Sequence, residues 1–180
     1  LFRSILGANG AGKTTLLSIL FGSIQPTAGS FKIAGYTYKD KSIKYKIGVV
    51  PQEYALYPTL TARENLHYFG SLYGLKGKTL YKATETALQR VNLLEVADKK
   101  IEHFSGGMKR RINLIAAILH QPEVLFLDEP TVGVDIVSKQ IIINYLKELN
   151  SKGMSVLYTS HHLQEAQDFC QRLAILSNRR

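Results

Sequence analysis

The feature that most constrains this chain is the segment 7–14, which reads G-A-N-G-A-G-K-T and matches the phosphate-loop pattern G-x-x-x-x-G-K-[ST]. A short apolar run, Ile5 and Leu6, precedes the segment, and a helical pattern follows it. In such a loop the glycines let successive backbone N–H groups point into one concavity, and the helix start adds positive potential. Lys13 can then reach the β- and γ-phosphates, and the Thr14 hydroxyl can ligate Mg²⁺. The segment therefore predicts a polyphosphate ligand at a helix N-terminus.

A glycine-rich turn that only caps a helix is the competing interpretation of this segment. It would explain the three glycines, but it leaves Lys13 and Thr14 at the matching offset without an explanation. With glycine at about 7% of residues, two fixed glycines followed by Lys and Ser/Thr should occur by chance on the order of once per 10⁴ positions or less. We therefore favour the phosphate site. The residues expected to bind the ligand are Gly7, Ala8, Asn9, Gly10, Ala11, Gly12, Lys13, Thr14 and Thr15.

Composition places the chain among ordinary globular proteins. Its 180 residues suit one domain, and 45% of them are hydrophobic while 21% are charged. No apolar run approaches the length of about 18 residues expected of a membrane-spanning helix, and no secretory signal is visible, so we expect a cytosolic chain. Cys170 is the only cysteine, which excludes an internal disulfide and a multi-cysteine metal site.

The formal net charge of +9 raises the question of an anionic partner. Much of the excess is spread through lysines in 39–46, 76–82 and 99–100, without aromatic residues arranged as a base-stacking platform. We interpret these lysines as solvated surface residues, and nucleic acid is not an expected partner.

Hydrophobic periodicity predicts strands that alternate with helices. The expected strands are 31–36 (closed by Gly35), 47–50, 124–127, 155–159 and 174–176. The expected helices are 14–21, a mostly helical stretch over 61–96, one that opens at Ser105, 136–149 and 163–169. This alternation predicts a parallel α/β sheet, in which ligands bind at the carboxyl ends of the strands. The phosphate loop falls at that edge, and so does the acidic pair Asp128 and Glu129.

Further motifs follow the phosphate loop in order. They are Gln52, Phe104-Ser105-Gly106-Gly107-Met108, Leu125-Phe126-Leu127-Asp128-Glu129, Pro130-Thr131-Val132-Gly133-Val134-Asp135 and Thr159-Ser160-His161. Together with the loop they resemble the Walker A, Q-loop, signature, Walker B, D-loop and switch motifs of the ATP-binding cassette (ABC) nucleotide-binding domain. The resemblance covers the chain from its first residues to its last.

The resemblance implies a fold and a division of the chain. The expected fold is a P-loop NTPase of α/β class with a parallel core sheet, a small antiparallel β part that is incomplete in this chain, and a helical subdomain. Residues 1–180 would form one ABC ATPase domain, in which 1–60 and 104–180 make a RecA-like catalytic core and 61–103 the helical subdomain.

Roles for single residues follow from the resemblance and from the chemistry of ATP hydrolysis. Adjacent carboxylates at a strand end can divide two tasks, so Asp128 would hold Mg²⁺ while Glu129 polarises the attacking water. Lys13 would contact the β- and γ-phosphates, and His161 would contact the γ-phosphate or the attacking water. Gln52 would contact Mg²⁺ and signal to a membrane partner. Each assignment has a competing interpretation. The acidic pair could be a solvated turn or a helix cap, His161 a surface histidine, and Gln52 a polar residue that follows a strand.

The resemblance also implies that two antiparallel copies of the domain enclose two ATP molecules. Ser105, Gly106, Gly107 and Asp135 would act on the nucleotide of the second copy. A plain N-cap is the alternative for Ser105, because serine is a good N-cap residue. A second nucleotide-binding domain and a transmembrane permease are thus the expected partners, ATP and Mg²⁺ the expected cofactors, and the cytoplasmic face of a membrane the expected location.

Met108 departs from the family pattern, in which glutamine is commonest at this position. The variant resembles the drug-efflux and lipid-transport branches, so we expect an exporter. The chain also starts almost at the phosphate loop, whereas the family carries about two strands before it, so we expect a fragment of a longer protein. The alternative functions are a non-transport ABC ATPase acting on ribosomes or DNA, and a P-loop kinase or GTP switch. The second would leave the signature motif and His161 without a task.

Overall fold

The computed structural model describes residues 2–161, 163, 167 and 170–177. Most of the helix expected at 163–169 lies outside these residues. The chain forms two compact units, which are built from interleaved segments. Unit 1 comprises Leu1–Gln52, Pro122–Pro130 and Leu149–Arg180, and unit 2 comprises Glu53–Gln121 and Thr131–Glu148. The functional division expected from the sequence, with its helical subdomain at 61–103, stays a prediction.

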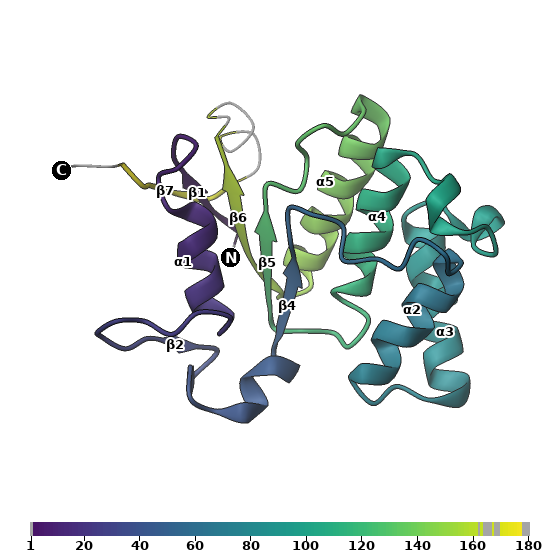
Figure 1. Ribbon diagram of the computed structural model, residues 1–180, viewed down its shortest axis with the longest axis horizontal. Helices are drawn as coiled ribbons and strands as arrows, with labels where there is room; N and C mark the ends of the chain where they lie inside the picture. Colours follow the sequence, from purple (N-terminus) through teal and green to yellow (C-terminus); the bar gives the residue numbers. More distant parts are fainter. Residues whose placement is uncertain (1, 162, 164–166, 168–169, 178–180) are drawn as a thin grey trace. The chain divides into compact units, whose positions relative to one another are not determined.

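Unit 1 contains a sheet of five parallel strands in the order β4-β5-β6-β1-β7 (Figure 1). The strands are β1 (Phe2–Leu6), β4 (Ile47–Val50), β5 (Val124–Asp128), β6 (Ser155–Ser160) and β7 (Arg172–Ile175). The predicted parallel sheet is confirmed. Because all five strands run the same way, their carboxyl ends meet at one edge, where the loops that follow them gather.

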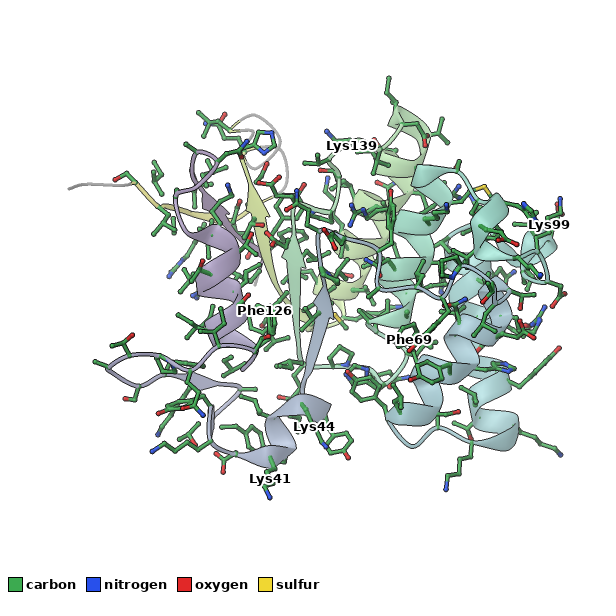
Figure 2. The ribbon with its side chains drawn as sticks, in the orientation of Figure 1. Lys41, Lys44, Phe69, Lys99, Phe126 and Lys139 are labelled. Atoms are coloured by element: carbon green, nitrogen blue, oxygen red, sulfur yellow. The ribbon has the colours of Figure 1, made fainter. Side chains whose placement is uncertain are left out.

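The centre of this sheet is apolar because the first four residues of β5, Val124 to Leu127, are hydrophobic, and the last three of these are buried. Helix α1 (Lys13–Leu20) packs on β5. Leu17 of α1 and Phe126 of β5 belong to one buried cluster with Ile33 and Ile47, and Figure 2 labels Phe126 within it. This packing fixes α1, and with it the loop that leads into the helix, against the sheet.

A two-stranded antiparallel sheet, β2 (Lys32–Ile33) and β3 (Tyr36–Thr37), also belongs to unit 1. The prediction of one strand over 31–36 is wrong here, because the chain reverses within it. Ala34 and Gly35 both have positive φ, 51° and 83°. Positive φ at both central residues is what a two-residue type I′ hairpin turn needs. This hairpin is the small antiparallel part that the resemblance implied.

Unit 2 is helical. It contains α2 (Ala62–Leu72), α3 (Gly77–Arg90), α4 (Gly106–Ala116) and most of α5 (Ile136–Ser151), with short 3₁₀ helices at Leu94–Val96 and Ile101–His103. Helix α2 packs against both α3 and α4. Thr61 starts α2 with a capping box: its hydroxyl accepts from the Glu64 N–H at 3.1 Å, and the Glu64 carboxylate accepts from the Thr61 N–H at 2.8 Å.

In the part of the chain that the structure describes, no helix combines the length and the apolar character that a membrane crossing requires.

Candidate functional site

The phosphate loop joins β1 to α1, as the sequence predicts. Gly7 follows β1, and a Cβ at this position would lie 2.7 Å from the carbonyl oxygen of Leu176 and 3.1 Å from the Ala11 Cβ, so only glycine fits. Gly12 is the N-cap of α1 and has a left-handed φ of 94°, which a β-carbon disfavours. The loop from Ala8 to Gly10 is exposed. The backbone therefore turns sharply into α1 and leaves this part of the loop open to solvent.

Lys13, the first residue of α1, directs its ammonium group back toward the loop. The group donates to the carbonyl oxygens of Gly7 at 2.9 Å and Ala8 at 3.2 Å. It also forms an ion pair with Glu129, with 3.2 Å between Nζ and Oε1. Lys13 is only 5% exposed and Glu129 only 7%. Buried charges of this kind are stable only when they are paired and hydrogen-bonded, and both conditions are met here.

Glu129 itself has an unusual backbone. It comes directly after β5, and its φ is +47°, in the left-handed region that non-glycine residues seldom adopt. Such a conformation costs on the order of 1–3 kcal/mol and persists only where surrounding contacts impose it. Its N–H donates to the Thr159 hydroxyl at 3.0 Å, and its carboxylate binds Lys13. The turn thus redirects the chain straight after Asp128.

His161 lies at the same carboxylate. Its Nδ1 is 3.2 Å from Oε1 of Glu129. The histidine follows β6, which is paired with β5 in the register Asp128 opposite Thr159. Three predicted catalytic residues, Lys13, Glu129 and His161, are therefore brought together in unit 1 around one carboxylate oxygen. A cation, a carboxylate and an imidazole in contact can position a phosphate and accept or share a proton.

The predicted magnesium ligands were Thr14, Asp128 and Gln52. Asp128 is buried at the carboxyl end of β5, and Thr14 is exposed in the first turn of α1. Gln52 is exposed and follows β4, whose last residue, Val50, pairs with Leu127 of β5, so it emerges at the same sheet edge as Asp128.

The donor chemistry of these residues suits Mg²⁺. In the described part of the chain no three His, Cys, Asp or Glu side chains cluster as a metal cage. Mg²⁺ usually binds one or two carboxylates together with substrate phosphates and waters. One carboxylate, one hydroxyl and one amide next to a phosphate loop are therefore typical of Mg²⁺ that is bound together with a nucleotide. They are not typical of a metal site built from protein ligands alone.

The signature residues belong to unit 2, where they start α4. Ser105 is the N-cap, and its hydroxyl accepts from the Met108 N–H at 3.2 Å. Gly107 packs so closely that a Cβ there would overlap the Asp135 carboxylate and the Ser138 side chain. The cap interpretation of Ser105 is thus confirmed as a structural role, and its contact with a second copy stays a prediction.

Asp135 has a structural role that the sequence analysis did not assign. Its carboxylate accepts from the Ser138 N–H at 2.8 Å and its carbonyl from the Lys139 N–H at 2.9 Å, so it caps the start of α5. These bonds from Ser138, and the nearby charge of Arg111, lower the pKa of Asp135 below its usual value. The carboxylate therefore stays ionised at the positive end of the helix.

Thr159 was named only as part of the switch motif, and the sequence analysis gave it no role of its own. The Thr159 hydroxyl is 2.7 Å from Oδ1 of Asp128 and accepts from the Glu129 N–H. Threonine in a β-strand gives no signal by itself, because it is a common strand residue. Only the pairing of β5 with β6 shows that it faces the acidic pair.

Comparison with known proteins places this geometry in a family. The sequence profile of the family described as ABC transporter matches residues 2–132. The linearmycin resistance ATP-binding protein LnrL of Bacillus subtilis (strain 168) is 48% identical over 96% of this chain and 56% of its own length. The Nod factor export ATP-binding protein I of Burkholderia lata is 38% identical over 98% of this chain and 59% of its own length. The chain thus spans less than two thirds of either relative.

The fold of this chain is also similar to that of a solved ATP-binding protein. An ATP-binding cassette, solved as a dimer in a post-hydrolysis state bound to ADP and Pi, superposes with a TM-score of 0.88 at 29% identity, over 99% of this chain and 83% of its own. The P-loop NTPase fold implied by the resemblance is confirmed. With the phosphate loop, the acidic pair at the end of β5 and the histidine after β6 in their places, this chain belongs to the ABC transporter family of ATP-binding proteins.

Proposed function

We propose that this chain binds ATP and hydrolyses it to ADP and phosphate. The observation that carries the proposal is the buried Glu129 carboxylate, which contacts both Lys13 and His161 at the carboxyl end of β5. A base and two phosphate-binding groups are the parts that phosphoryl transfer to water requires. The phosphate loop supplies the backbone N–H groups for the nucleotide.

Each residue then has one task in the reaction. Water attacks the γ-phosphorus, the bond to the β,γ-bridging oxygen breaks, and ADP leaves with that bonding pair. Glu129 accepts the proton of the attacking water, while Lys13 and His161 stabilise negative charge on the γ-phosphate oxygens. Lys13 exchanges its Glu129 contact for phosphate oxygens, which frees the carboxylate for water.

Magnesium completes the site as we propose it. Thr14 and Asp128 would hold the ion, and Gln52 would reach it from the end of β4. Bound there, Mg²⁺ would neutralise charge on the β- and γ-phosphates. The chain's own contribution is to keep Asp128 buried and oriented at the strand end.

We further propose that two copies act together. Ser105, Gly106, Gly107 and Asp135 would contact the nucleotide of the second copy. The start of α4 presents backbone N–H groups, which favour an anion. A related cassette was solved as a dimer, which supports the same arrangement for this chain.

Transport across a membrane is the activity that we propose for the whole protein. A transmembrane permease would receive the motion of the dimer on the cytoplasmic face of the membrane. The name of the Burkholderia lata relative describes export, and Met108 agrees with that direction. We therefore propose an exporter as the assembly in which this chain acts.

The test of hydrolysis uses the intact protein and the substitution Glu129→Gln. Loss of the general base should lower kcat about 10²–10⁴-fold while ATP affinity stays. Glu123→Gln is the matched control, because Glu123 lies just before β5 in an exposed ion pair with Lys46. Phosphate release and binding of a fluorescent ATP analogue are measured for both. Wild-type turnover in Glu129→Gln would refute the base assignment.

The test of the two-copy arrangement uses Ser105→Arg in the Glu129→Gln background. The bulky cation should block ATP-dependent dimers and leave ATP binding by monomers intact. Thr61→Arg replaces the N-cap of α2 in the same unit and controls for loss of a cap. Light scattering with saturating ATP reports the dimer. Dimers that persist in Ser105→Arg would contradict a contact at the start of α4.

A further inference from the structure

The side chain of Thr159 joins the two acidic residues of the site. Thr159 lies in β6 directly opposite Asp128 of β5 and is 0% exposed. Its hydroxyl oxygen is 2.7 Å from Oδ1 of Asp128, 3.3 Å from the carbonyl oxygen of Leu127, and 3.0 Å from the Glu129 nitrogen, whose N–H it accepts. One buried hydroxyl thus contacts three consecutive residues at the end of β5.

The chemistry of a hydroxyl assigns the directions of these bonds. A threonine hydroxyl has one proton to donate and can accept at its lone pairs. The Glu129 N–H occupies the acceptor side. The proton goes to Asp128, because that distance is short and a bond to a carboxylate is stronger than a bond to the more distant Leu127 carbonyl. Oδ1 of Asp128 is therefore engaged by the protein.

The same hydroxyl acts on the backbone of Glu129. The peptide between Asp128 and Glu129 must take a fixed orientation to donate to Thr159, and this coincides with the left-handed φ of +47° at Glu129. A residue in that region needs surrounding contacts that impose it. Thr159 supplies one of them, so it helps to set where the Glu129 carboxylate points.

We propose that Thr159 is a positioning residue that fixes both the Asp128 carboxylate for Mg²⁺ and the turn that presents Glu129 to the attacking water. This inference rests on the proposed ATPase function. It is more specific, because it assigns the effect to one hydroxyl oxygen on the neighbouring strand.

The test compares Thr159→Ser, which keeps the hydroxyl, with Thr159→Val, which keeps the shape and removes it. Thr159→Val should lower kcat about 10–100-fold, the usual effect of losing a group that orients a metal ligand. ATP affinity in EDTA should stay within about twofold, and the gain in affinity on adding Mg²⁺ should shrink about 10–100-fold. Thr159→Ser should stay within about threefold of wild type in every measurement, since its hydroxyl oxygen is retained.

Thr84→Val is the matched control. Thr84 of α3 is also 0% exposed, and its hydroxyl has no hydrogen-bond partner among the described residues. Removing it deletes a buried threonine hydroxyl without touching the site, so turnover and the Mg²⁺ gain should match those of wild type. If Thr159→Val does not fold, Thr159→Ala replaces it, since alanine and serine differ there only by the hydroxyl oxygen.

Two results would overturn the inference while ATP hydrolysis by the wild type stands. One is a normal Mg²⁺ gain and kcat in Thr159→Val or Thr159→Ala. The other is an equal loss in Thr159→Ser, which would assign the effect to the methyl group and to packing. A wild-type protein that neither binds nor hydrolyses ATP would instead refute the proposed function itself, so the two failures are distinguishable.

Discussion

The polar side chains at the ends of strands and helices make different contacts in the two units. In unit 1, the charges of Lys13 and Glu129 are buried and bind each other. In unit 2, the side chains of Ser105 and Asp135 accept from backbone N–H groups and thereby start helices. In unit 1 the charged side chains bind each other and can exchange this contact for a ligand. In unit 2 the polar side chains cap the ends of helices.

This difference predicts different consequences of mutation. Removing one partner of a buried ion pair leaves the other charge without compensation, whereas loss of a helix cap typically costs about 0.5–2 kcal/mol. Substitution of Lys13 or Glu129 in unit 1 should therefore lower stability in addition to changing ligand binding or turnover. Substitutions in unit 2 should act first on the stability of its helices.

Apart from the loss of turnover in Glu129→Gln, the largest effect should come from Lys13→Ala. A hydrogen bond to a charged group contributes about 1.5–3 kcal/mol, so losing the lysine should weaken ATP binding about 10–150-fold. Calorimetry or a fluorescent ATP analogue measures the affinity of the intact protein. Lys46→Ala, which removes a lysine from the exposed pair with Glu123, should bind ATP as wild type does. If Lys13→Ala bound ATP with unchanged affinity, the buried charges of unit 1 would not be the ligand-binding groups that the comparison of the two units requires.

An intermediate effect is expected for Gly107→Ala. The added methyl group would overlap the Asp135 carboxylate and Ser138, and overpacking of this kind costs about 1–3 kcal/mol. Alanine in a helix recovers roughly 0.5–1 kcal/mol relative to glycine. The free energy of unfolding from urea titration should therefore fall.

Gly106→Ala is the matched substitution one residue earlier. Its Cβ would lie 3.3 Å from the Tyr54 hydroxyl oxygen, the flexible end of a side chain. We expect little change or a small gain in stability. An equal loss of unfolding free energy in both variants would show that the close approach of Gly107 to Asp135 is not the reason why alanine destabilises position 107.

The smallest effect should come from Asp135→Asn, and it depends on pH. The folded pKa of Asp135 is lowered by the Ser138 hydrogen bonds, so the carboxylate contributes stability above its unfolded pKa of about 3.9. That contribution is lost as the pH falls through the lower folded pKa. Asparagine still caps a helix but does not titrate. Urea unfolding should show a wild-type advantage at neutral pH that shrinks in acid; a pH-independent difference would contradict this origin.

Much of the fold could be predicted from the sequence because its signals are local. The run Val124 to Leu127 is apolar at every position, as a strand covered on both faces should be. The turn at Ala34 and Gly35 was missed because alanine gives no sign of a positive φ. Only the tertiary contacts of the hairpin decide that backbone choice.

The site was predictable to the extent that its residues lie in contiguous motifs. Lys13 and Glu129 were identified from the loop and from the end of β5, and the structure shows their ion pair. The role of Thr159 and the cap formed by Asp135 were not identified, because the first depends on strand register and the second on where α5 begins. Such pairings exist only in three dimensions.

The backbone conformation of residue 129 and its contact with Lys13 favour different amino acids at this position. Glycine would suit this backbone better than glutamate does, but it would leave the buried Lys13 ammonium without its carboxylate partner. A library at position 129 screened for the proposed ATP hydrolysis should return glutamate. At position 129 the proposed reaction would therefore favour a residue that the backbone conformation alone does not.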